Sequence, residues 1–206
     1  RPKDEIAQRV KMALQSTGLK YYPADYNGQG PIALTLALRD QARLDEIDQI
    51  IVSVHWGGWH AIGGGAGDHD EKWDPQTREV ADHSMAYLVA AALVDGDLNV
   101  DSFSEQRLAD PALRPLMQKI VVRDDPELTR EHAGELPRWP SRVEFVLSDG
   151  RRLGRSSGPP KGHPLNPMDD AELQAKFWRM SDLVLGREAD RKSTRLNSSH
   201  RIRSSM

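Results

Sequence analysis

The sequence predicts an α+β fold, because helical and strand patterns follow one another irregularly and two of the strands form a hairpin. A run of β-branched residues at 47–54 is typical of a strand with at least one buried face. Residues 143–147 and 151–154 flank Ser148-Asp149-Gly150, and Asp-Gly supplies the positive φ angles of a tight turn. Apolar residues at helical spacing occur before and after these strands, as a mixed fold requires.

Three helices are predicted in the first half of the chain, at residues 5–14, 31–43 and 77–94. Pro31 is tolerated at the start of the second helix, because its missing N–H would have no partner there. The third has apolar residues almost all round its axis, which indicates a buried central helix that ends at Gly96. We expect the glycine-rich stretch at 57–70 to be a flexible loop.

Shorter elements are predicted between the central helix and the hairpin. Two short helices are expected at 101–108 and 111–118, with Asp110 as the N-cap of the second. Residues 119–123 have the composition of a strand.

The C-terminal part begins with a linker rich in proline and glycine at 158–167. Asp169 and Glu172 have the spacing of a capping box, which predicts a helix to about residue 183. Beyond residue 187 the chain is polar, basic and rich in serine, and KSTRLNSSH resembles a translated sequencing adapter. Residues 191–206 are therefore excluded from the fold.

Composition excludes several classes of function. The 206 residues carry a net charge of -3 with 29% charged residues, a mixed surface that argues against general binding to nucleic acid or to anionic membranes. The longest apolar stretch, residues 85–94, is far shorter than the roughly 20 residues that cross a bilayer. The absence of cysteine excludes disulfides, thiolate zinc sites and cysteine-ligated iron–sulfur clusters. No secretory signal follows Arg1, so we expect a cytoplasmic protein whose beginning is missing.

The first candidate site is the loop KYYPADYNGQ at residues 20–29, just before a predicted helix. An anionic substrate at this helix start would meet free backbone N–H groups, a favourable helix dipole and the ammonium of Lys20. The alternative is an ordinary surface loop, with its tyrosines packed on the core and Lys20 in solvent.

The second candidate is the segment WDPQTREVADHS at residues 73–84. Neighbouring residues on a helix point in different directions, so Asp82-His83-Ser84 is not a catalytic triad. The i,i+4 spacing pairs Arg78 with Asp82 and Glu79 with His83, which would hold the imidazole beside a carboxylate. The alternative is that these pairs only stabilise the start of a buried helix.

A third segment, at residues 57–70, lies near His55, His60 and His69. Its glycines match neither a phosphate-binding loop nor a dinucleotide-binding fingerprint. The spacing of His55 and His60 does not place both on one helical face, and no cysteine lies nearby, so we expect no metal site.

Two of these motifs together resemble the second half of the MmgE/PrpD family. They are KYYPADYNGQ before an apolar helix, and KWDPQTREVADHSMAYLVAAALVDG before FSEQRLADPALRPLMQKIVV. The later GHPLNPMDDAELQAKF resembles the segment with which that family returns to its helical domain. The similarity runs from about Leu19 to about Phe177.

The resemblance implies a two-domain protein in which an α+β domain is inserted into an all-helical one. Residues 1–19 would be a remnant of the helical domain, residues 20–165 the α+β domain, and residues 166–187 a C-terminal helix returning to the helical domain. Residues 188–206 would be a disordered, adapter-derived tail. The family also implies a homodimer that needs no metal or other cofactor.

The resemblance implies a lyase that dehydrates 2-methylcitrate to 2-methylaconitate in propionate catabolism. Lys20 matches the lysine that the family places in the cleft between its domains, and Asp25 stands where other members have glutamate or histidine. These two are the expected catalytic residues. The expected contacts to a small tricarboxylate substrate are Tyr21, Asn27, Gln29, Arg78 and His83.

Other reactions of the family stay open as alternatives, because Asn27 and Gly28 replace a more usual His-Ser pair. They are the decarboxylation of cis-aconitate and the epimerisation of iminodisuccinate. A non-catalytic homologue or assembly module is the alternative from another class.

Overall fold

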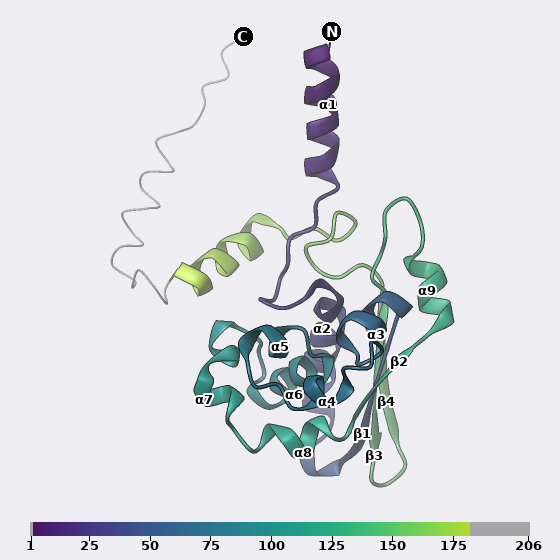
Figure 1. Cartoon of the computed structure of the whole chain (residues 1–206), viewed down its shortest axis with the longest axis vertical. Coiled ribbons are helices and arrows are strands. Elements are labelled where there is room, and N and C mark those ends of the chain that lie inside the picture. The colour runs from purple at the N-terminus through teal and green to yellow at the C-terminus, as the bar shows by residue number, and fades with distance from the viewer. Residues whose placement is uncertain (1, 182–206) are drawn as a thin grey trace. The chain divides into compact units, whose positions relative to one another are not determined.

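The structure, a computed structural model, describes residues 2–181, which belong to two compact units, Arg1–Pro167 and Met168–Met206. The first unit holds a four-stranded sheet of order β2-β1-β3-β4 together with helices (Figure 1). This mixture agrees with the α+β class that the sequence predicts. No helix within residues 2–181 combines the length and the apolar character that crossing a membrane requires.

Both parallel and antiparallel pairing occur in the sheet. The strands are β1 (Ile47–Val54), β2 (Ile120–Asp124), β3 (Ser141–Leu147) and β4 (Arg152–Ser157). β1 pairs in parallel with β2 and antiparallel with β3, and β3 and β4 form the hairpin. The structure thus confirms the predicted strands, with Gly150 at φ 84 in the predicted turn.

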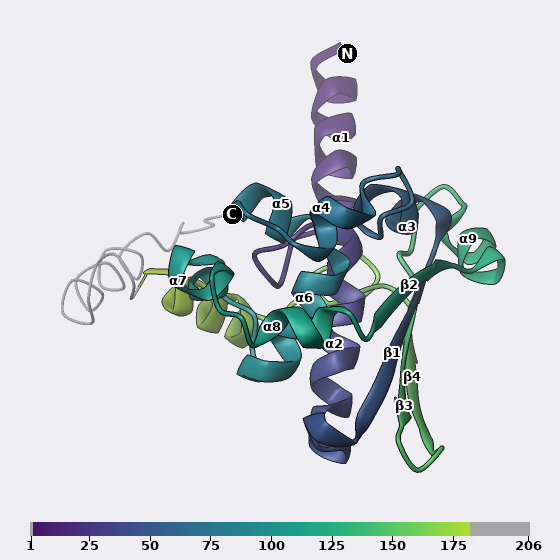
Figure 2. The ribbon, with the colours of Figure 1, turned by 60° about the horizontal axis from the view of Figure 1, so that its bottom comes forward.

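One face of the sheet is buried by helices. Ile50 and Val52 lie opposite Phe145 and Val143 on β3, and all four are fully buried. Helix α2 (Gln29–Leu38) packs on this side, against β3 and β4, and helix α6 (Met85–Asp95) packs against α2 (Figure 2). Every residue from 85 to 93 of α6 is at most 1% exposed, so the prediction of a buried central helix is confirmed.

The helix predicted at 77–94 is broken into two, α5 (Arg78–Asp82) and α6. Ser84 separates them as the N-cap of α6, with its hydroxyl accepting from the N–H of Tyr87 at 3.1 Å. The same hydroxyl donates to the carbonyl of Lys72. A capping serine satisfies the backbone locally, and so starts a new helix where the apolar pattern alone predicts continuity.

The stretch at 57–70 is not the flexible loop that was predicted. It contains α3 (Trp56–Ile62) and the start of α4 (His69–Trp73). His55 caps α3 by accepting from the N–H of Gly58, and Ile62 is fully buried. An N-cap and a buried apolar contact therefore outweigh the low helix propensity of the glycines.

The first predicted helix is confirmed as α1 (Pro2–Gln15), whose residues 4–10 are exposed. α2 begins at Gln29, two residues earlier than predicted, and ends at Leu38, before the 3-10 turn η2 (Arg39–Gln41). Pro31 is thus the third residue of α2. This position is tolerated because the first four N–H groups of a helix have no partner within it.

The remaining elements are short. The predicted helices at 101–108 and 111–118 correspond to η4 (Val100–Phe103), α7 (Glu105–Leu108) and α8 (Leu113–Met117), and another 3-10 turn, η3 (Leu44–Glu46), precedes β1. The prediction of Asp110 as the N-cap of α8 was wrong, because the Asp110 carboxylate binds the N–H of Ala112 in a turn and the helix starts two residues later than expected. The prediction missed α9 (Pro126–His132), although Asp125 and Pro126 have the residue types of an N-cap and a first helical position.

In the second unit, residues 170–181 are helical. The N–H of Asp169 donates to the Glu172 carboxylate, and the N–H of Glu172 donates to the Asp169 carboxylate, both at 2.8 Å. The predicted capping box is therefore confirmed. The expected end of this helix near residue 183 and the excluded tail at 188–206 lie outside the described residues.

We expect Ser84→Ala to destabilise the protein by about 2–3 kcal/mol, because it removes a cap and leaves the buried carbonyl of Lys72 without its donor. Ser104→Ala is the matched control, since Ser104 caps α7 from an exposed position, and should cost about 1 kcal/mol or less. Urea denaturation of the two variants measures the difference. Equal losses would contradict this account of Ser84.

Candidate active site

The loop at residues 20–29 is held together by the side chain of Gln29, which is 1% exposed. Its amide oxygen accepts from the N–H groups of Tyr21 and Tyr22 at 2.9 and 2.8 Å. Its amide nitrogen donates to the carbonyls of Tyr22, Ala24 and Asp25 at 3.0, 3.3 and 3.3 Å. The amide thus serves the loop itself, and its expected contact with substrate stays a prediction.

Gly28 lets the loop approach the core. A Cβ at this position would lie 2.7 Å from a methyl carbon of Leu88 on α6. Such a contact is too short for a real side chain, so glycine permits the close approach here. The loop is therefore packed on the buried helix as well as bound by Gln29.

The side chain of Lys20 is exposed at the start of this loop, and Tyr21 beside it is partly buried against the ring of Tyr22. The first unit alone therefore does not enclose the ammonium of Lys20. Enclosing it in a cleft, as the resemblance implies, would require a further surface. The roles of Lys20 and Tyr21 stay predictions.

Asp25 and Asn27 form a hydrogen-bonded pair across the 3-10 turn η1 (Tyr26–Gly28). One oxygen of Asp25, Oδ1, accepts from both the backbone N–H and the side-chain Nδ2 of Asn27, each at 2.8 Å. The other face of the Asn27 amide, Oδ1, lies 2.9 Å from Nε2 of His55. Asn27 therefore connects the loop to the N-terminus of α3.

His55 and His132 stack on each other, with ring centroids 3.8 Å apart and planes within 5°. His55 directly follows β1 and His132 ends α9, which follows β2, so both lie beyond the carboxyl ends of two neighbouring parallel strands. Burial, and then the nearby His132, lower the pKa of His55 to about 4. Burial also lowers the pKa of His132.

Sequence reasoning considered His55 only as a metal ligand and gave no role to His132. Within residues 2–181 no cluster of histidine and carboxylate side chains has the arrangement of a metal site. The available signal for His55 was its place at the end of a strand, three residues before a glycine N–H that it could cap. No local signal exists for the stacking partner, which lies 77 positions along the chain from it.

His83 reaches the loop from the second predicted segment. Its Nε2 lies 3.9 Å from the second carboxylate oxygen of Asp25, and the N–H of Asp25 donates to the carbonyl of Asp82 at 3.1 Å. The two segments singled out in the sequence are therefore adjacent in space. His83 faces Oδ2 of Asp25, whereas Asn27 donates to Oδ1.

The predicted partner of His83 was the Glu79 carboxylate, but its ring nitrogen Nδ1 lies 3.0 Å from the Glu79 carbonyl instead. α5 ends at Asp82, and this brings the ring back over the last turn. Asp82 contacts the same nitrogen, rather than forming the predicted pair with Arg78. Arg78 is exposed at the first residue of α5, and its contact with substrate stays a prediction.

The hydrogen-bond partners define what His83 can do. A carbonyl oxygen only accepts, so Nδ1 carries the hydrogen in the neutral ring and Nε2 is left as a base. The side chain is 53% exposed, which leaves Nε2 open to a ligand. The Asp25 carboxylate, the His83 imidazole and the Lys20 ammonium together suit the removal of a proton from an anionic substrate.

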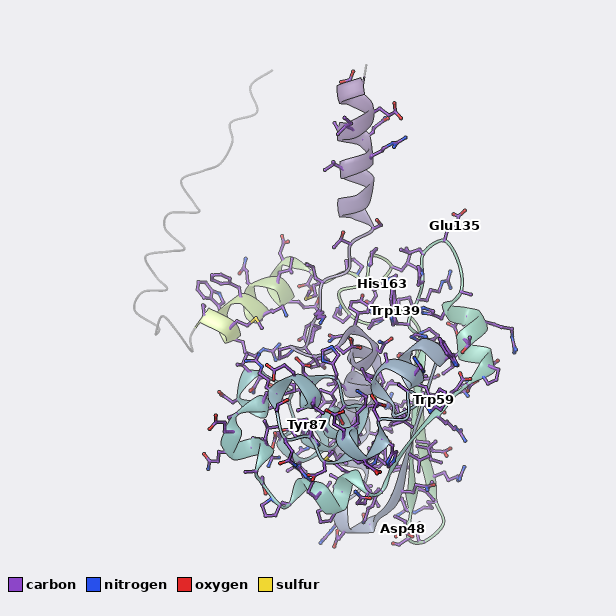
Figure 3. All side chains as sticks on the ribbon, in the orientation of Figure 1. Asp48, Trp59, Tyr87, Glu135, Trp139 and His163 are labelled. Carbon is purple, nitrogen blue, oxygen red and sulfur yellow. The ribbon has the colours of Figure 1, made fainter. Side chains whose placement is uncertain are left out.

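Trp139 packs on Tyr26 of η1 and lies beside His163 (Figure 3). Its backbone φ of 49 is in the left-handed region, which is costly for a residue with a large side chain. The indole meets the rings of Tyr26 and His132 edge-on, with ring centroids 4.8 and 4.9 Å apart. Its centroid lies 5.9 Å from that of the His163 ring. Trp139, Tyr26 and His163 also line a cavity of about 280 Å³.

The α+β unit, with acid–base groups meeting at one loop, has the features of an enzyme domain. Residues 22–200 match the MmgE/PrpD C-terminal domain, and the chain therefore belongs to the MmgE/PrpD family. The matched range extends into residues 188–200, outside the part that the structure describes.

Curated relatives of the chain carry two different activities in their names. Cis-aconitate decarboxylase of Mus musculus is 26% identical over 114 residues, which are 55% of this chain and 22% of that protein. The enzyme of that name from Homo sapiens is 28% identical over 106 residues, or 50% and 21%. The 2-methylcitrate dehydratase of Salmonella typhimurium is 23% identical over 139 residues, or 65% and 27%. The chain thus spans only a minor part of each relative's length.

Protonation of His55 predicts how stability depends on pH. An exposed imidazole takes up a proton near pH 6.5, whereas the folded ring stays neutral to about pH 4. The unfolded chain therefore binds more protons between these values, and the free energy of unfolding should fall by on the order of 3 kcal/mol as pH drops through them.

Urea denaturation at several pH values measures this fall. His55→Asn should reduce it, because asparagine does not titrate, while His132 would still contribute in the same direction. His60→Gln, an exposed change on the same helix, is the control and should leave the fall as in the parent. An unchanged pH dependence in His55→Asn would contradict the prediction.

Proposed function

We propose that the protein to which this chain belongs is a lyase that dehydrates 2-methylcitrate to 2-methylaconitate. Family membership and the dehydratase among its relatives support this activity. The single observation that carries the proposal is the approach of Asp25 to His83, at 3.9 Å, from two segments far apart in the sequence.

The reaction removes a proton next to a carboxylate and then expels a hydroxyl group. In the proposed mechanism Nε2 of His83 accepts the proton, and the electron pair of the C–H bond moves toward the adjacent carboxylate. The ammonium of Lys20 stabilises the charge that accumulates there. The C–O bond then breaks as the pair forms the C=C bond, and the hydroxyl leaves as water.

Asp25 contributes through its free oxygen. Both hydrogen bonds from Asn27 go to Oδ1, so Oδ2 keeps its acceptor capacity and faces His83. In the proposal this oxygen holds the protonated imidazole, which then delivers its proton to the leaving hydroxyl. General acid–base help of this kind is worth about 10²–10⁴-fold in rate.

The proposal extends to the surroundings of the site. The substrate is a small tricarboxylate, held by Lys20 with Tyr21 and Arg78, while the amides of Asn27 and Gln29 hold the loop in shape. The protein acts as a cytoplasmic homodimer in propionate catabolism and uses neither metal nor organic cofactor. Apart from the cytoplasmic location, these points rest on the family resemblance.

Decarboxylation of cis-aconitate is the second candidate. The two decarboxylases match at 26% and 28% identity, against 23% for the dehydratase. Both reactions need cationic stabilisation beside a carboxylate, and they differ in whether a hydroxyl group or carbon dioxide leaves.

The test is to purify the full-length protein and to assay it on 2-methylcitrate, cis-aconitate and iminodisuccinate. We expect turnover of 2-methylcitrate to exceed that of the others. A preference for cis-aconitate or iminodisuccinate would replace the reaction but keep the class of substrate. Failure to bind or convert any of the three would favour a non-catalytic role.

We expect Lys20→Ala in the full-length protein to lower kcat by at least about 10²-fold, because it removes the charge that stabilises the developing carboxylate anion. Lys20→Arg should recover part of the loss, since it keeps a cation without the geometry of an ammonium. Lys161→Ala, a lysine change outside the loop, is the control. Near-parental kcat for Lys20→Ala would reject the assignment.

A further inference from the structure

The bonds between Asp25, Asn27 and His55 have only one consistent set of directions. A carboxylate only accepts, so the side of the Asn27 amide that faces Asp25 is Nδ2, at 2.8 Å. The amide oxygen then faces His55, and as an acceptor it requires a hydrogen on Nε2, at 2.9 Å. Nδ1 of His55 is left without a hydrogen, as an acceptor must be.

The N-terminus of α3 extends this chain of hydrogen bonds beyond His55. The N–H of Gly58 points at Nδ1 of His55 at 3.4 Å, so a backbone donor meets the unprotonated nitrogen. The opposite tautomer would set two hydrogens against each other at Gly58 and two acceptors against each other at Asn27. The backbone of α3 thus selects the tautomer of His55, and the tautomer selects the orientation of the Asn27 amide.

The surroundings of His55 keep the ring in place. It is 5% exposed and stacks on His132, and Trp139 contacts the far ring. The charged groups that face it are the carboxylates of Asp124 and Asp25, and its low pKa keeps it neutral near pH 7. A ring so confined cannot turn to release Asn27 without displacing the stack.

We infer that His55 is a positioning residue, which fixes the Asn27 amide and through it presents the free oxygen of Asp25 to the reacting groups. The effect on turnover rests on the proposed function. The geometry rests on the hydrogen bonds alone, and so can be tested without any substrate.

Two substitutions test the roles of the two ring nitrogens of His55 separately. His55→Asn can still accept from the N–H of Gly58, because its Oδ1 stands where Nδ1 stood, but it has no donor that reaches Asn27. His55→Gln can reach Asn27 with its amide nitrogen but loses the cap. His60→Gln is the control, because His60 stacks on Trp56 in the same helix and is exposed.

In the full-length protein we expect His55→Asn to lower kcat by about 10–100-fold, as displaced catalytic groups do, with KM within about threefold and a smaller fall in melting temperature than in His55→Gln, because the cap is kept. His55→Gln should keep most of kcat while lowering the melting temperature. Asn27→Leu should lower kcat like His55→Asn, and the double variant should lose no more than either single one. His60→Gln should match the parent throughout.

Parental kcat in His55→Asn, or losses in His55→Asn and Asn27→Leu that multiply, would overturn the inference. If the parent converts none of the three polycarboxylates, the proposed function fails, and ¹⁵N spectra of histidine-labelled protein decide the inference separately. A neutral His55 with its hydrogen on Nε2, whose Nε2 signal shifts in Asn27→Leu, would support it. A hydrogen on Nδ1 would overturn it.

Discussion

The side-chain amide of Gln29 is the interaction on which the rest of the candidate site depends. Gln29 is the first residue of α2, a helix packed on the sheet, and its amide binds the backbone of the loop that carries Lys20 and Asp25. Each such hydrogen bond contributes about 0.5–1.5 kcal/mol net. Several meet in one buried amide, so the loop takes its shape from the core and loses little further entropy when a ligand binds.

The sheet explains why the other parts of the site meet this loop. β1 and β2 are parallel neighbours, so their carboxyl ends lie at the same edge, and His55 and the segment leading to His132 start there. Ligand sites of open sheets that contain parallel strands favour this edge. α5 then brings His83 to Asp25 from the side of the buried helix. Three separate segments thus contribute to one small region.

Much of the fold was predictable because its signals are local. The β-branched run of β1, the Asp-Gly turn and the left-handed Gly96 after α6 all appear within a few residues of the element that they define. The break at Ser84 and the helix after His55 were missed. There a side chain caps a helix where the apolar pattern or the glycines indicate otherwise. Asp125-Pro126 was equally local and could have predicted α9.

The candidate site divides in the same way. Residues 20–29 and His83 were singled out as candidates from residue type and spacing, and the structure brings Asp25 and His83 together. The surroundings of Asn27 were not found, because the stack of His55 on His132 and the contact with Trp139 join positions with no sequence relation. The expected enclosure of Lys20 does not arise within residues 2–181, where its side chain is exposed.

The matched polarity of Asp25, Asn27 and His55 limits how this region can evolve. A side chain at position 27 that can only donate would leave the N–H of His55 without an acceptor. One that can only accept would face the Asp25 carboxylate with a second acceptor. A neutral histidine at position 27 carries one donor and one acceptor, so it would keep this polarity only in the tautomer that places its hydrogen toward Asp25. These three positions are constrained to change as a set, which ties the acid–base chemistry of the loop to the capping of a distant helix.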